Sequence, residues 1–334
     1  MIIRSRAPLR ISFGGGGTDV SPYCDEHKGV VFNSTIDKYA YCTIVPRKDK
    51  KIHIRSLDFN TTEKWIVKDA FLYDGNLDLV KAVLNHFDIK QGFDMFLHCD
   101  APPGSGLGSS STVIVSIIGA ISKWLRIPMS PYDTAHLAYE LERKDLGMLG
   151  GRQDQYAATF GGFNYMEFSD NETIVTPIRI RDDILHEFHY RLLLAHTGKT
   201  RNSGNIIKNQ KTNVEKGKKE VISSLDAVKE LAEKIKNSLV KGDIDKMAEF
   251  IDESWHYKKK ISRYISNPYI DKLYETAKKH GAVGGKISGA GGGGFVFFIC
   301  KFDKKHIVAN KLEKMGAVPM TFTFDKHGLQ TWRR

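Results

Sequence analysis

The segment APPGSGLGSSSTV, residues 101–113, says most about the fold and function of this sequence. Three glycines, at positions 104, 106 and 108, run into three consecutive serines before an apolar stretch with helical spacing begins at Val113. Glycine permits backbone angles closed to other residues and lets a ligand approach the main chain. Serine favours the cap of a helix, and the unpaired N–H groups at a helix start attract anions. The segment therefore predicts a phosphate-binding loop at a helix start, and with it a nucleotide-handling enzyme.

The best-known phosphate-binding motifs do not match this loop. The sequence contains Gly198-Lys199-Thr200, but Leu193 stands where a P-loop requires glycine. A dinucleotide fingerprint requires a third glycine at the position of Ser109. The His-Arg-Asp and Asp-Phe-Gly motifs of protein kinases are absent from the sequence. These three enzyme classes are thereby excluded.

The composition is that of an ordinary globular protein with 334 residues, 41% apolar and 27% charged, a length that favours two domains. No apolar run approaches the roughly 20 residues of a membrane span, and the alternating N-terminal residues are not expected to be a signal peptide. The four cysteines lie far apart without metal-binding spacing, so we expect reduced thiols and a cytoplasmic protein without membrane contact. The net charge of +11 is spread along the chain among acidic residues, so we expect no nucleic-acid partner; it suits polyanionic small-molecule substrates.

Hydrophobic periodicity predicts strands in the first third and a mixture of helices and strands in the last half, an α+β arrangement. We place the domain boundary near residue 180, giving domains of residues 1–180 and 181–334. The expected strands are Ile2–Phe13, Val30–Ile36, Tyr39–Pro46, Lys51–Ser56, Gly161–Tyr165, Tyr190–His196, Phe295–Cys300 and Pro319–Asp325. The expected helical segments are Leu77–Phe87, Thr112–Leu125, Pro131–Lys144, Asn205–Gly242, Ile244–Tyr264, Pro268–His280 and Lys304–Lys314.

Two further segments have sequence patterns like those of a known enzyme family. RAPLRISFGGGGTDVSPY, Arg6–Tyr23, resembles the first motif of the GHMP superfamily, the small-molecule kinases named for galactokinase, homoserine kinase, mevalonate kinase and phosphomevalonate kinase. Residues 101–113 resemble its second motif, and KISGAGGGGF, Lys286–Phe295, resembles its third. The resemblance covers essentially the whole chain. It implies a two-domain α+β fold, with an N-terminal domain like the second domain of ribosomal protein S5, a ferredoxin-like C-terminal domain, and an active site between them.

The resemblance also implies site residues for ATP-dependent phosphoryl transfer. Asp154 matches the aspartate that accepts the proton of the attacking hydroxyl, and Arg10 matches the basic residue that stabilises the transferring group. Ser110 and Glu142 match the Mg²⁺ ligands; Glu142 stands about one residue further from Asp154 than in mevalonate kinases, which leaves Glu140 as a second candidate. The ATP phosphates are expected to bind at Pro103, Gly104, Ser105, Gly106, Leu107, Gly108, Ser109, Ser110, Ser111, Gly289, Ala290, Gly291 and Gly292.

Substrate choice within the superfamily depends on the first motif, which here is similar to that of the D-glycero-D-manno-heptose 7-phosphate kinases. That resemblance implies phosphorylation of the anomeric oxygen to give the 1,7-bisphosphate. Asp19 matches a residue that holds sugar hydroxyls, beside Gly16, Gly17 and Thr18. A phosphorylated sugar needs a second anion site, for which cations and hydroxyls after the expected strand Tyr190–His196 are suited; this set comprises Lys199, Thr200, Arg201 and Ser203, with Arg152 from the turn before Asp154.

Three alternatives stay open at the level of sequence. The first is another sugar 1-kinase, such as an L-fucose kinase, which has a related Gly-Gly-x-Thr-Asp pattern. The second is a basic nucleic-acid-binding protein, since S5-like domains occur in such proteins. The third is a sugar sensor that has lost catalysis, although the candidate base and metal ligands are all present. The oligomeric state and the adenine-binding residues are not indicated by any motif.

Overall fold

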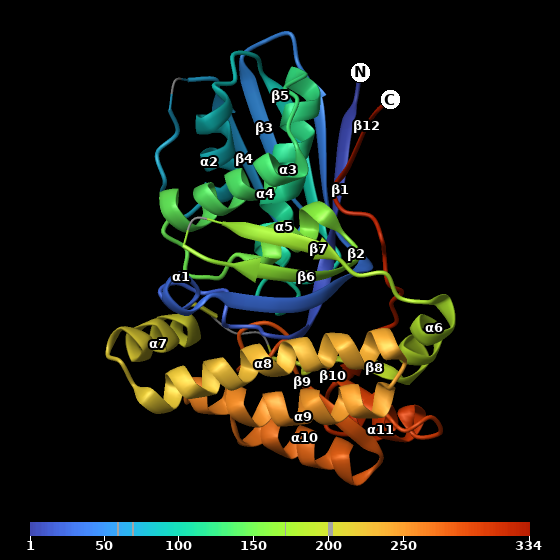
Figure 1. Cartoon of the computed structure of the whole chain (residues 1–334). Coiled ribbons are helices and arrows are strands. Elements are labelled where there is room, and N and C mark those ends of the chain that lie inside the picture. The colour runs from blue at the N-terminus through green and yellow to red at the C-terminus, as the bar shows by residue number, and fades with distance from the viewer. Residues whose placement is uncertain (59, 69, 171, 200–202) are drawn as a thin grey trace.

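The computed structural model describes residues 1–58, 60–68, 70–170, 172–199 and 203–334. Within them, a larger β-sheet lies above a smaller one, and two long helices, residues 219–241 and 244–261, run across in front of the smaller sheet (Figure 1). The upper sheet has the strand order β12-β1-β2-β5-β3-β4, and β6 and β7 extend from β2. Its strands are β1 Ile3–Gly14, β2 Gly29–Pro46, β3 Lys51–Ser56, β4 Thr61–Ile66, β5 Phe93–Cys99, β6 Phe163–Phe168, β7 Thr173–Pro177 and β12 Gln330–Arg333.

The lower sheet consists of β8 Leu192–His196, β9 Ala282–Ile287, β10 Phe295–Cys300 and β11 Val318–Pro319, in the order β11-β8-β10-β9. Numbered along the chain, this order is 4-1-3-2, and every neighbouring pair is antiparallel. Helical segments connect β8 to β9 and β10 to β11, which is the βαββαβ pattern of ferredoxin-like domains. The α+β class and the ferredoxin-like C-terminal domain expected from the sequence are confirmed.

The helices of the first domain are α1 Tyr23–His27, α2 Asp78–Phe87, α3 Ser109–Leu125, α4 Pro131–Tyr139, the π-helical turn η1 Glu140–Asp145 and α5 Gln153–Phe160. The remaining helices are α6 Asp182–Arg191, α7 Ser203–Glu215, α8 Lys219–Lys241, α9 Ile244–Ile261, α10 Pro268–Lys279 and α11 Lys305–Glu313. The helix α3 packs on β1 and β2, whereas α8 contacts those strands from the second domain. None of the described helices is both long and apolar enough to cross a membrane.

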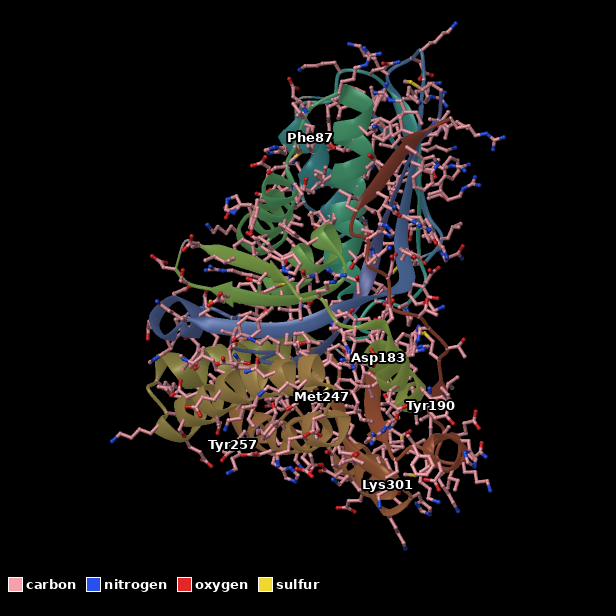
Figure 2. The ribbon with its side chains drawn as sticks, turned by 45° about the vertical axis from the view of Figure 1, so that its right-hand side comes forward. Phe87, Asp183, Tyr190, Met247, Tyr257 and Lys301 are labelled. Carbon is pink, nitrogen blue, oxygen red and sulfur yellow. The ribbon has the colours of Figure 1, made fainter. Side chains whose placement is uncertain are left out.

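One hydrophobic core joins the two domains. The ring of Phe13 on β1 lies 5.3 Å from that of Phe188 and 5.6 Å from that of Phe297 (centroid to centroid), so both sheets contribute to one aromatic cluster. Apolar residues of α8 and α9, including the fully buried Met247 labelled in Figure 2, extend this cluster. Residues of both domains therefore share one close-packed core.

Several predicted elements differ from the observed ones. The segments Val30–Ile36 and Tyr39–Pro46 form one continuous strand, β2, whose pairing with β1 has a register shift at residues 36–38. Asn205–Gly242 is divided into α7 and α8 near Gly217, which adopts a φ of 62°. Pro319–Asp325 is wrong as a strand, since only residues 318–319 and an isolated bridge at Phe324 are β-structure.

The predicted boundary at residue 180 falls between β7 and α6, where the chain leaves the upper sheet. The last residues return to that sheet, because β12 pairs with β1. The tail from residue 318 therefore crosses from the lower sheet to the upper one. The division into domains of residues 1–180 and 181–334 stays a prediction. Within it, β12 belongs to the second domain by sequence but pairs with the sheet of the first domain.

Candidate active site

A cleft brings the three glycine-containing segments together between the two sheets. Its lining comes from β1 and the loop after it, the loop and first turn of α3, the turn η1, the residues before and at the start of α5, the helices α7 and α9, and the turn after β9. The lining residues are Arg10, Gly17, Asp19, Val20, Gly104, Gly106, Gly108, Ser109, Ser110, Ser111, Glu142, Arg143, Met148, Leu149, Gly150, Gly151, Gln153, Asp154, Ile207, Gln210, Lys258, Gly289 and Ala290.

The loop before α3 has the backbone that its glycines permit. The φ angles of Gly104, Gly106 and Gly108 are 75°, 82° and 81°, which L-residues with side chains rarely adopt. The helix begins at Ser109, and Gly108 is its N-cap, with no side-chain cap hydrogen bond. The expectation that serines cap the helix is therefore wrong: they form its first turn, and Ser110 lines the cleft. A positive helix end thus faces the cleft.

Not every residue expected to contact ATP lines the cleft. Ser105 and Leu107 are fully buried, and Pro103 is exposed outside the lining. Ser105 has a structural role, because its main-chain carbonyl accepts a hydrogen bond of 2.8 Å from the Phe295 N–H. The buried residues Ser105 and Leu107 thus anchor the segment, while its three glycines and the serines 109–111 line the cleft.

The third motif packs directly against the second. The carbonyl of Gly106 accepts a hydrogen bond from the Ser288 hydroxyl at 3.0 Å and another from Arg10 Nη1 at 2.7 Å. Gly289 and Ala290 line the cleft. Gly291 and Gly292 do not: a Cβ on Gly291 would lie 2.7 Å from Ile265, and the N–H of Gly292 donates to the Ile265 carbonyl. The glycine run serves close backbone packing as well as the cleft.

Arg10 and Asp154 form an ion pair at the centre of the cleft. Arg10 Nε donates to Asp154 Oδ1 at 2.8 Å, and Nη2 lies 2.5 Å from the same oxygen. The Arg10 side chain is 4% exposed and that of Asp154 20%, so the carboxylate keeps a face toward the cleft. Gly108 is so close to Asp154 that a Cβ there would lie 3.3 Å from Asp154 Cγ. A cation, a carboxylate and the phosphate loop therefore converge on one point.

Asp19 organises the loop of the first motif. Its carboxylate accepts hydrogen bonds from the Gly17 N–H at 3.0 Å and the Gln153 N–H at 3.2 Å. A Cβ on Gly151 would lie 1.9 Å from Asp19 Oδ2, so only glycine leaves room for this contact. Thr18 is fully buried and binds the Gly15 and Val30 carbonyls, so its hydroxyl faces away from the cleft. Of the expected sugar-binding loop, Gly17 and Asp19 line the cleft, and Gly16 is next to them without being among the lining residues.

The candidate metal ligand Glu142 is fully buried within η1. Its Oε2 accepts hydrogen bonds from Ser111 Oγ at 2.6 Å and Gln155 Nε2 at 2.7 Å. Its Oε1 accepts no hydrogen bond, although Arg143 Nη1 lies 3.3 Å away. A π turn takes one residue more per hydrogen-bonded turn than an α turn, which accommodates the longer spacing between Glu142 and Asp154. Glu140 instead lies partly exposed and pairs with Lys144 at 2.8 Å.

Of the residues expected to bind a distal phosphate, the structure describes the side chains of Arg152 and Lys199, and neither lines the cleft. The guanidinium of Arg152 donates hydrogen bonds to Asp25 at 2.7 Å and to the Ser169 carbonyl, so it already has partners within the protein. Lys199 is exposed and lies over the Tyr269 ring, 4.8 Å from its centroid. Thr200, Arg201 and the side chain of Ser203 lie outside the described residues.

Three polar residues at the site were not singled out from the sequence. Lys258 on α9 and Gln210 on α7 line the cleft, and Gln210 Nε2 donates to the Gly17 carbonyl at 2.7 Å. Both stand in runs of polar residues on amphipathic helices, so nothing in the local sequence distinguishes them from their neighbours. Lys286 belongs to the third motif and is 1% exposed on β9. Burial, with Lys258 and Arg10 nearby, lowers its pKa well below the ordinary value.

Comparisons with known proteins agree with this geometry. Residues 77–162 match the model of the GHMP kinases N-terminal domain, and residues 227–318 match that of the GHMP kinases C-terminal domain. The chain is 41% identical over 337 residues to a D-glycero-alpha-D-manno-heptose 7-phosphate kinase of Campylobacter jejuni, covering 99% of each chain. It is 26% identical over 315 residues to a bifunctional fucokinase/GDP-fucose pyrophosphorylase of Arabidopsis thaliana, covering 89% of this chain and 30% of that protein.

Comparison with solved structures also finds a heptose-phosphate kinase. A crystal structure described as a D-glycero-D-manno-heptose 1-phosphate kinase from Bacteroides thetaiotaomicron superimposes with a TM-score of 0.84 and 36% identity, covering 99% of both chains. The sequence matches span both domains, and the cleft lies where their glycine-containing segments meet. The chain belongs to the GHMP kinases.

Proposed function

We propose that this kinase transfers the γ-phosphoryl group of ATP to the anomeric hydroxyl of D-glycero-D-manno-heptose 7-phosphate, giving the 1,7-bisphosphate. The observation that carries the chemistry is the Arg10–Asp154 pair held against the phosphate loop at Gly106 and Gly108. The heptose is supported by the 41% identity with the Campylobacter jejuni enzyme, compared with 26% for the fucokinase. The Bacteroides thetaiotaomicron structure is described as a heptose 1-phosphate kinase, whereas the Campylobacter jejuni enzyme is a heptose 7-phosphate kinase. The hydroxyl that accepts the phosphoryl group is therefore the part of the proposal to test.

The cleft residues suit an in-line displacement. The anomeric oxygen forms a bond to the γ-phosphorus as the bond from that phosphorus to the β–γ bridging oxygen breaks, and its electron pair leaves with ADP. The hydroxyl proton passes to the carboxylate of Asp154, whose exposed face lies toward the cleft. Arg10 provides a permanent positive charge beside the transferred group. The first turn of α3 offers main-chain N–H groups to the phosphates.

Magnesium fits the oxygen donors of this site. Glu142 keeps one buried carboxylate oxygen without a hydrogen bond, and the hydroxyl-bearing Ser110 lines the same cleft. Mg²⁺ prefers such hard ligands and often takes only one or two from protein. Among the described residues no group of three or more acidic, histidine or cysteine side chains is arranged to hold a metal, which suits an ion bound mainly through ATP. When bound, it would neutralise charge on the phosphates.

The sugar is expected to lie beside Asp19, Gly17 and Gly16, with its distal phosphate near the segment of residues 196–203. We retain Lys199, Thr200, Arg201 and Ser203 as candidate ligands of that phosphate, with Arg152 as a weaker candidate because its guanidinium already has partners within the protein. The backbone of this segment contacts the third motif, since the Gly294 N–H donates to the Lys199 carbonyl at 2.8 Å. The four described cysteines are free and buried, which agrees with the proposed cytoplasmic location.

An ADP-release assay over phosphorylated and free heptoses, hexoses and L-fucose tests this function. We expect turnover with the 7-phosphate heptose, and phosphorus NMR of the product should show a new signal coupled to the anomeric proton. Turnover of the 1-phosphate, or of free fucose, at a higher kcat/KM would refute the assigned acceptor. Arg201→Ala should raise the KM for the phosphorylated heptose far more than the KM for ATP.

A further inference from the structure

Lys258 stands where the phosphate side and the sugar side of the cleft meet. It lies on α9, is 4% exposed and lines the cleft. Its Nζ donates to the Gly289 carbonyl at 2.7 Å, in the turn that packs on the phosphate loop. The same Nζ lies 3.4 Å from the point that a Cβ on Gly16 would occupy, in the loop expected to hold the sugar. A ligand atom beside this ammonium would therefore be close to both substrates.

Basic side chains gather around this point of the cleft. Arg10, Lys258 and Lys286 are each at most 4% exposed, while the carboxylates facing them are those of Asp19 and Asp154. Lys258 and Arg10 both line the cleft, one from each domain, so an oxyanion bound there could accept hydrogen bonds from both side chains.

Unused polar atoms near Lys258 also indicate a ligand. Ser12 Oγ lies 3.4 Å and Gln153 Nε2 3.8 Å from the same Cβ point of Gly16. Ser12 is 1% and Gln153 7% exposed, and both Ser12 Oγ and Gln153 Oε1 have no hydrogen-bond partner in the structure. Buried polar atoms are nearly always hydrogen-bonded, so exceptions at a cleft point to groups that arrive with a substrate.

We propose that Lys258 is a phosphoryl-binding residue: its ammonium contacts the oxygens of the group in transit, supplying from the second domain a cation that acts together with Arg10. This role rests on the proposed phosphoryl transfer, and it is independent of which sugar accepts. Because charge on those oxygens must be neutralised during the transfer, a preorganised cation lowers the barrier more than it strengthens ATP binding. The geometry at Gly16 and Gly289 places it at the junction that this requires.

The test compares Lys258→Met with Lys258→Arg and with Lys259→Met. Lys259 is the matched control, since it is the next residue on α9, is one-third exposed and pairs with Asp271 at 3.3 Å away from the cleft lining. We expect Lys258→Met to lower kcat on the order of 10²-fold with little change in the KM for ATP. Lys258→Arg should recover part of the rate, and Lys259→Met should behave as wild type.

A structural role of Lys258 in holding the Gly289 turn predicts a different pattern. In that case the melting temperature and ADP affinity would fall together in Lys258→Met, and Lys258→Arg would give no recovery of kcat at equal stability. Either that result or an unchanged kcat would overturn the assignment.

Calorimetry without any sugar separates this inference from the proposed function. ADP with beryllium fluoride mimics the γ-phosphoryl group, so Lys258→Met should lose affinity for that complex while binding ADP alone as wild type does. If the wild-type enzyme phosphorylates no sugar in the panel, the acceptor assignment fails, yet this comparison still decides the role of Lys258. Equal affinities of wild type and Lys258→Met for the complex would refute it.

Discussion

Alanine at Gly151 should damage sugar binding by displacing Asp19. The added Cβ would lie 1.9 Å from Asp19 Oδ2 and 2.5 Å from its Cγ, whereas ordinary contacts begin near 3.4 Å. The carboxylate must therefore retreat by about 1.5 Å, a displacement large enough to break well-aligned hydrogen bonds. The bonds at risk are those from the N–H groups of Gly17 and Gln153. The φ of Gly151 is not in the left-handed region, so alanine itself is tolerated there.

The size of the effect follows from these contacts. One hydrogen bond to a charged group contributes about 1.5–3 kcal/mol, which corresponds to roughly 10- to 150-fold in kcat/KM for the sugar. The KM for ATP should change little, because the phosphate loop is not touched by the added methyl group. Gly147→Ala is the matched control in the same loop: its φ is 64°, but a Cβ there meets nothing within 4 Å.

Steady-state kinetics, with the sugar and ATP varied in turn, measure the change in kcat and KM for each substrate. Melting curves of both variants measure the change in stability. Gly147→Ala should lose some stability, about 1–2 kcal/mol from its backbone angle, and keep wild-type kinetics. An unchanged KM and kcat for the sugar in Gly151→Ala, or an equal loss for ATP, would show that Asp19 does not position the acceptor.

Three further predictions concern charged groups of the cleft. Asp154→Asn should lower kcat by about 10²- to 10⁴-fold while calorimetry finds ADP binding intact, and wild-type turnover by this variant would exclude Asp154 as the base. Glu142→Gln should need on the order of 10-fold more Mg²⁺ for half-maximal rate, whereas Glu140→Gln should not; the reverse order would transfer the ligand role to Glu140. Lys286→Met should alter the pH dependence of stability. Burial lowers the pKa of Lys286 below the 10.5 of the unfolded chain, so between these values the unfolded state binds more protons and wild-type stability rises with pH. Between neutral pH and about pH 10, the melting temperature should rise more steeply with pH for wild type than for Lys286→Met. An equal pH dependence of the two melting temperatures would contradict the lowered pKa.

The sequence predicts the parts of the site that depend on continuous motifs. Gly104, Gly106 and Gly108 indicate the phosphate loop because their positive φ angles are a local requirement that only glycine meets easily. Amphipathic spacing likewise predicts most helices, since one buried face is enough to define them.

What the sequence does not predict depends on contacts between distant segments. The short β12 is recognisable only through its pairing with β1, which is 324 residues or more away. Arg152 has the chemistry of a phosphate ligand, but a carboxylate from α1 takes its guanidinium. Lys258 has no motif around it, and only the packing of α9 against β9 brings its ammonium to the cleft.

The shared carbonyl of Gly106 has a mechanical consequence for how substrates enter. Because it accepts donors from Arg10 in one domain and Ser288 in the other, any rotation between the domains must pivot about this oxygen or break one of its bonds. A pivot at the nucleotide loop would leave the ATP end nearly stationary while the far rim, near Met148 and Ile207, swings through the larger arc. Opening of the enzyme would then admit and release the sugar more freely than the nucleotide.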